Sequence, residues 1–283
     1  MTPARAHRER MAALAAQRVD PNPVVSSDGG GQPAPAIIDR TPAMIHREQV
    51  AATAIVAAPE NVTSAEDRIA AQIVLRLTHD LRRLKEIKSI DLKIAAKREM
   101  LPEYRAWIEG VLAADAGVGT GLAAEVVPTC MVWLIDVGDY EAALTLAAFV
   151  LRHRVAMPSR YQRDAATIIV EEIATAAIKA QGVGESFPRD VLDRLADLTD
   201  ACDIHDEVRA KLYKAIGVEQ LEVAEAMDAA ESGPALQRAL SSLTEAQRLH
   251  DRVGVKDKIK RAKKLLAAVA DATNNEQGGQ QAA

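Results

Sequence analysis

Aromatic residues and cysteines are scarce in this chain, and each scarcity argues against a class of structure. Phe, Trp and Tyr together make up 3% of the 283 residues. Strands are enriched in aromatic and β-branched side chains, so an all-β sandwich or barrel is not expected. The two cysteines, Cys130 and Cys202, cannot form a disulfide framework or a cysteine-based zinc site. They fit a reducing cytoplasm, where we expect the protein to reside.

Long apolar runs and catalytic signature motifs are also missing. No stretch of 18 uninterrupted apolar residues occurs, so no transmembrane helix is expected, and the short apolar run near the N-terminus is too weak for a secretory signal. No GxxxxGK[ST] motif is present, so this chain is not expected to hydrolyse ATP through a Walker loop, and no GxSxG motif occurs either. The six histidines are scattered, so we do not expect a zinc site. We also expect no cofactor.

Alanine is abundant instead. The chain holds 54 alanines, and alanine has the highest intrinsic helix propensity. Ile69, Ile73 and Leu77 lie four residues apart, the spacing of an apolar stripe on a helix. Thr63 and Glu66 precede this stripe with the spacing of a capping box. The sequence therefore predicts an all-α protein.

The pattern along the chain predicts helical hairpins between two tails. Residues 1–60 hold seven of the 12 prolines and no aromatic residue, a composition typical of a disordered tail. Residues 61–233 are predicted to form a helical core, in which two helices joined by a turn at residues 137–139 resemble one tetratricopeptide unit. Residues 234–272 predict a basic helical hairpin, and residues 273–283 a frayed tail. No continuous 34-residue period establishes a solenoid.

Positive charge gathers in two windows, although the formal net charge is −5. Residues 76–98 carry eight basic and three acidic side chains, and residues 252–264 carry seven and one. Two interpretations stay open: solvated helix faces, or contacts with the phosphates of double-stranded DNA. No aromatic residue is interleaved, so stacking on single strands is not indicated. The candidate DNA-binding residues are Arg82, Arg83, Lys85, Lys88, Lys93, Lys97, Arg98, Lys256, Lys260, Arg261, Lys263 and Lys264.

Four carboxylates are weak candidates for catalysis, namely Asp136, Asp139, Glu171 and Glu172. A two-metal nuclease needs several acidic ligands around Mg²⁺, but this spacing is unspecific. Adjacent glutamates point about 100° apart on a helix, and the two aspartates are explained as turn formers. We therefore assign no catalytic residue from the sequence, and we expect Mg²⁺ only if the chain is itself an endonuclease.

Three stretches, in this order, resemble the small terminase subunit family of tailed bacteriophages, of the gpM type. They are LRRLKEIKSIDLKIAAKREMLPEYRAWIEGVL, VWLIDVGDYEAALTLAAFVLRHRVAMP and DEVRAKLYKAIG. The segments KREMLP and GDYEAAL are specific in combination. The resemblance runs from about residue 75 to residue 217 and continues more loosely through the final hairpin.

The resemblance implies a homo-oligomeric subunit, often a ring, of a genome-packaging motor in the bacterial host cytoplasm. Such a subunit recognises viral double-stranded DNA and recruits a large subunit that carries ATPase and nuclease activities. The family is often labelled the endonuclease subunit of terminase. One alternative is therefore that this chain is a metal-dependent DNA endonuclease, and a second is a helical protein–protein adapter. We favour a non-catalytic recognition subunit without a membrane partner, because the ATP motif is missing and the acidic spacing is unspecific.

Overall fold

The computed structural model describes residues 40–118 and 121–280, and in these ranges all regular secondary structure is helical. This confirms the all-α prediction. The α-helices are α2 (Pro42–Ala57), α3 (Ser64–Glu86), α4 (Ile90–Met100), α5 (Arg105–Ala114), α6 (Val126–Val137), α7 (Tyr140–Arg152), α8 (Ala165–Gly182), α9 (Arg189–Thr199), α10 (Asp206–Ala226), α11 (Ala229–Leu249) and α12 (Lys256–Gln280). Short 3-10 helices are η1 (Pro59–Asn61), η2 (Leu101–Tyr104) and η3 (Leu122–Glu125).

Local capping residues start several of these helices where the sequence predicts. The capping box is present: the Glu66 backbone N–H donates to the Thr63 hydroxyl, and the Thr63 N–H donates to the Glu66 carboxylate. Between α6 and α7, Gly138 adopts a left-handed conformation with φ 84°, and Asp139 accepts a hydrogen bond from the first turn of α7. The helical hairpin predicted around residues 137–139 is therefore confirmed.

Helix α2 corrects the expectation that residues 1–60 form a disordered tail. Thr41 caps α2 and Pro42 occupies its first turn, both favourable at a helix start. Ala51 and Ala52 are fully buried, and α2 packs against α5 and α3. Composition averaged over 60 residues concealed this helical segment. Residues 1–39, which carry most of the expected tail, lie outside the described residues.

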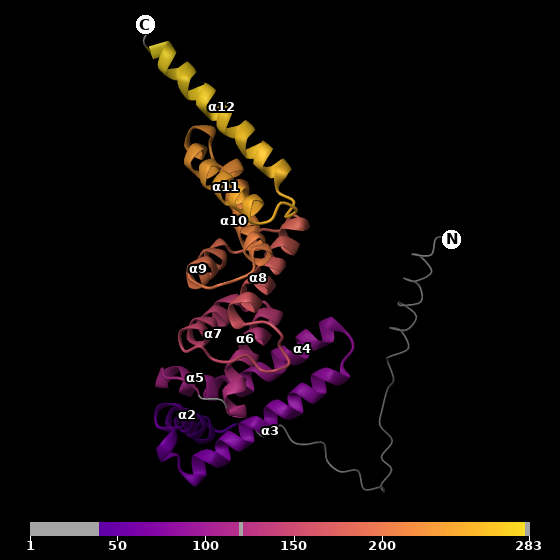
Figure 1. Cartoon of the computed structure of the whole chain (residues 1–283), viewed down its shortest axis with the longest axis vertical. Helices are drawn as coiled ribbons and strands as arrows, with labels where there is room; N and C mark the ends of the chain where they lie inside the picture. The colour runs from indigo at the N-terminus through magenta and orange to yellow at the C-terminus, as the bar shows by residue number, and fades with distance from the viewer. Residues whose placement is uncertain (1–39, 119–120, 281–283) are drawn as a thin grey trace, which may run out of the picture. The chain divides into compact units, whose positions relative to one another are not determined.

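Two hydrophobic cores meet within α10. The first core, built from α2 to the start of α10, contains Trp133, whose ring makes an edge-to-face contact with Tyr104 at a centroid distance of 5.8 Å. The second core joins α10, α11 and α12 through residues such as Leu221 and Leu243. Side chains of α10 belong to both cores. The second core therefore begins before residue 233, near which the sequence suggests a boundary. These helices are drawn in orange and yellow in Figure 1.

The C-terminal hairpin is present, but its ends differ from the prediction. Helix α11 begins at Ala229, so Pro234 lies inside it rather than at its start. Gly254, with φ 79°, lies in the connection to α12. Helix α12 extends to Gln280, past residue 273, where a frayed tail was expected. Residues 281–283 lie outside the described part. None of the described helices is long and apolar enough to cross a membrane.

Candidate nucleic-acid interface

An exposed basic surface lies where α3 turns into α4, which we call the α3–α4 tip (residues 82–93). Figure 1 shows the short turn that joins the two helices. Arg82, Lys85 and Lys88 are exposed, and Lys93 is half-buried. Within the described ranges, none of these four side chains forms an ion pair. Their positive charge is therefore available to an external anion.

The other three candidates of this window are engaged within the fold. Arg83 pairs with Glu99 of α4 at 2.9 Å, and both side chains are exposed. Lys97 donates to Asp136 of α6 at 2.5 Å, and only 17% of its side chain is exposed. Arg98 donates to the carbonyl oxygen at the end of α6. Because its charge is matched and largely covered, Lys97 contributes to packing of α4 on α6 rather than to an open surface.

The second basic surface lies on the first turns of α12. Four of its candidates are exposed, namely Lys256, Lys260, Lys263 and Lys264. Arg261 differs from them, because its guanidinium pairs with Glu225 of α10 at 2.7 Å. Ala262 is fully buried in the second core, which orients the helix. The helices that carry the α3–α4 tip pack in the first core, and α12 packs in the second. The two basic surfaces are therefore separate.

The four candidate carboxylates do not form a metal centre in the described structure. Asp136 is held by the ion pair described above, and Asp139 caps α7. On α8, Glu171 pairs with Arg163 and, at 3.0 Å, with Lys211, whereas Glu172 is exposed. Among the described residues, no group of three or more His, Cys, Asp or Glu side chains is placed to hold a metal ion. Three of the four carboxylates thus have a structural partner.

Buried polar groups that sequence reasoning missed also serve the fold. Glu219 of α10 is 4% exposed and accepts hydrogen bonds from the Gln181 amide at 2.8 Å and the Phe187 backbone N–H at 2.9 Å. Residues 182–233, which carry 13 acidic and five basic side chains, are therefore not solvated throughout. The only sequence signal was the position of Glu219 among apolar residues of α10. Burial also raises the pKa of the Cys130 thiol, which makes it a poor nucleophile.

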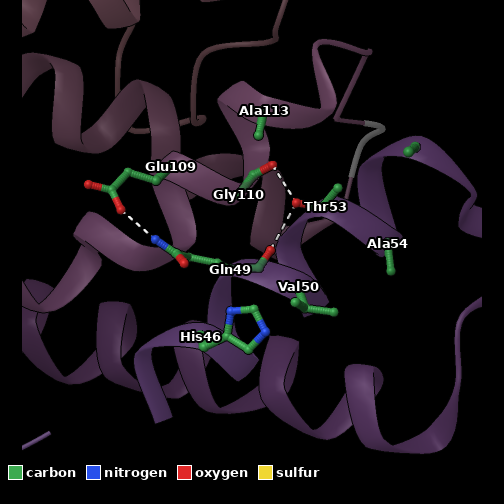
Figure 2. A pocket seen from close by; sticks show the side chains of 9 residues that line it. His46, Gln49, Val50, Thr53, Ala54, Glu109, Gly110 and Ala113 are labelled. Carbon is green, nitrogen blue, oxygen red and sulfur yellow. Dashed lines mark hydrogen bonds between the residues drawn. The ribbon is translucent and has the colours of Figure 1, made fainter. Parts of the chain in front are cut away.

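A surface cavity of about 530 Å³ lies between α2 and α5. Figure 2 shows the hydrogen bonds that the side chains of Gln49 and Thr53 make there. The Gln49 amide donates to Glu109 at 2.6 Å, and the Thr53 hydroxyl lies within hydrogen-bond distance of the carbonyl oxygens of Gln49 and Gly110. The remaining lining is mainly small and apolar, apart from His46. This arrangement is a packing seam and lacks converging catalytic groups.

Comparisons with known proteins point to one family. The family model described as "Phage small terminase subunit" matches residues 74–207, a range that includes the α3–α4 tip. "Terminase, endonuclease subunit" of Escherichia phage P2 is 35% identical over 226 residues, which cover 80% of this chain and 85% of that protein. "Probable terminase, endonuclease subunit" of Haemophilus phage HP1 (strain HP1c1) is 25% identical over 154 residues, covering 52% of this chain and 54% of that protein. No solved structure matches.

Proposed function

This chain belongs to the phage small terminase subunit family, and from that membership we propose that it is a DNA-recognition subunit for genome packaging. It binds viral double-stranded DNA and recruits a large subunit that hydrolyses ATP and cuts the DNA. The observation that carries the proposal is the set of exposed cations without intrachain ion pairs at the α3–α4 tip and on α12.

The electrostatics favour duplex phosphates as the ligand. A cation that contacts a phosphate releases condensed counterions, and each such contact steepens the dependence of affinity on salt. A cation already paired with a carboxylate gains less free energy from a phosphate. Lys97 and Arg261 therefore contribute less to DNA affinity than Lys85 or Lys260. We further propose that several copies assemble into a ring. Repeated modest patches then gain avidity without new contacts.

The test is a gel-shift series with the full chain and supercoiled phage DNA at increasing salt. The tip variant carries Arg82→Glu, Lys85→Glu and Lys88→Glu, and the same charge change is placed at exposed cations elsewhere as the matched control, Arg68→Glu, Lys179→Glu and Arg238→Glu. We expect only the tip variant to lose most of its affinity and to flatten the salt slope, by about 0.9 for each phosphate contact removed. Equal affinity of the two variants would remove the tip from the interface.

The names of both relatives favour the endonuclease alternative. The same gel with Mg²⁺ separates it from recognition alone. Intact, retarded DNA that is released as salt rises supports recognition. Nicked DNA that persists through repurification and disappears in Asp136→Ala or Glu172→Ala identifies the chain as the enzyme. If the protein does not retard DNA even at low salt, the adapter alternative remains.

A further inference from the structure

The α3–α4 tip exposes two large aliphatic side chains among its cations. Ile90 is 74% exposed and Leu92 is 62% exposed, at the first and third residues of α4. The buried residues of α4, Ala96 and Met100, lie in its second half. The first turn of α4 therefore projects beyond the core. Leaving such side chains in water forgoes the favourable free energy of burying them, so a ligand that covers them gains affinity.

We propose that α4 enters the major groove of the DNA with its N-terminal end first, so that Ile90 and Leu92, which lie about 200° apart around the helix, contact thymine methyl groups. This inference rests on the proposed DNA binding and adds to it a source of sequence preference. The major groove admits an α-helix, and the thymine methyl is the apolar group that base edges display there. Phosphate contacts position a protein on DNA, whereas contacts with base edges specify the sequence.

The charges around the aliphatic pair suit this placement. Arg82 and Lys85 on the last turns of α3 precede the pair, Lys88 lies in the turn, and Lys93 follows the pair on α4. A helix in the major groove has a phosphate backbone on each side, and cations from both helices of the tip lie within the same short segment as the apolar contact. The exposed carboxylates of Glu86 and Asp91 do not cancel these cations, so the tip is positively charged overall.

A symmetric contact with a second copy of this chain fits the same surface less well. A symmetric contact between two copies places the same patch on both sides. The cations of one tip would then face the cations of the other, and like charges across an interface are costly. The charge pattern thus favours DNA as the occupant of the aliphatic pair. The contacts of a ring pair different patches, and the sedimentation measurement below separates them from DNA binding.

The experiment removes methyl groups from either side of the proposed contact. Wild-type protein first selects its preferred duplexes from a randomised library, and each thymine of the selected sequence is then replaced in turn by uracil, which lacks only the methyl group. The double variant Ile90→Ala, Leu92→Ala is compared with Leu75→Ala, which removes an equally exposed (69%) leucine from α3 about two turns before the tip. Affinities and salt slopes are measured for all three proteins.

We expect wild type and Leu75→Ala to lose about fourfold in affinity for each contacted methyl group removed. The double variant has already lost that preference, so uracil leaves its affinity unchanged, while its salt slope stays that of wild type. Tight DNA binding with no response to uracil in any protein overturns this inference alone. A double variant that changes its sedimentation but not its DNA preference also overturns it. If the wild-type protein binds no DNA, the proposed function itself is refuted.

Discussion

The substitution Gly110→Ala tests how α2 is held on the first core. A Cβ atom at position 110 of α5 would lie 2.3 Å from the carbonyl oxygen of Gln49 and 2.8 Å from the Cβ of Ala52, both on α2. Ordinary van der Waals contacts of a Cβ begin near 3.4 Å. Neither neighbour can rotate away, because one is backbone and the other a Cβ. Helix α2 therefore has to move by about 1 Å against a close-packed interior.

The magnitude follows from two opposing effects. Overpacking of a core costs typically about 1–3 kcal/mol, and a clash this short with rigid atoms belongs at the upper end. Alanine in place of glycine inside a helix returns roughly 1 kcal/mol. We expect a net loss of about 2 kcal/mol in the free energy of unfolding. For a chain of this size that lowers the melting temperature by about 4–8 °C.

Two measurements on the full chain check this prediction. Circular dichroism gives the melting temperature, and hydrogen exchange with mass spectrometry reports protection of residues 42–57. If α2 detaches at a lower cost than the clash, the melting temperature changes little but the protection of α2 is lost. The control is Gly117→Ala, where a Cβ meets nothing within 4 Å. A Gly110→Ala protein with wild-type melting and wild-type α2 protection would refute the packing argument.

Three further predictions concern ion pairs, acid sensitivity and thiol reactivity. Lys97→Met should lower the free energy of unfolding by about 1 kcal/mol, because it leaves the half-buried Asp136 carboxylate without its partner. The double variant Lys97→Met, Asp136→Leu should recover most of this free energy, and urea unfolding measures both variants. Burial alone would raise the pKa of Asp164, but hydrogen bonds from the first turn of α8 outweigh burial and lower it. Its ionised form therefore stabilises the fold above its ordinary pKa of 3.8, and this contribution is lost as the pH falls through its lower value in the folded protein. Asp164→Asn should cost about 0.5–1 kcal/mol at pH 7, and the difference from wild type should shrink below pH 3.8; equal differences at pH 7 and pH 3 contradict this. Maleimide labelling followed by mass spectrometry should modify half-buried Cys202 well before buried Cys130, and the reverse order would mean that the first core opens readily.

Much of the helical architecture follows from local sequence signals. A capping box, a glycine in the left-handed region and apolar spacing act over a few residues, so the start of α3 and the turn between α6 and α7 are predictable. Helix α2 also has local start signals in Thr41 and Pro42, but its place in the fold depends on distant residues. It is secured by contacts with residues about 60 positions away, such as the Gln49–Glu109 hydrogen bond, and composition carries no record of them.

The sequence alone determined the helical class, the two windows of positive charge and the similarity to a terminase family, because each depends on residue types and their order. Only the tertiary structure decided which side chains remain available. Lys85 and Lys97 are the same residue type in one charged window, yet Lys97 meets Asp136, 39 residues further along the chain, and Lys85 meets no carboxylate among the described residues. The exposure of Ile90 likewise depends on how far α4 projects from the core. Such distinctions arise from packing between distant segments, which brings charges together or leaves them to solvent and ligands.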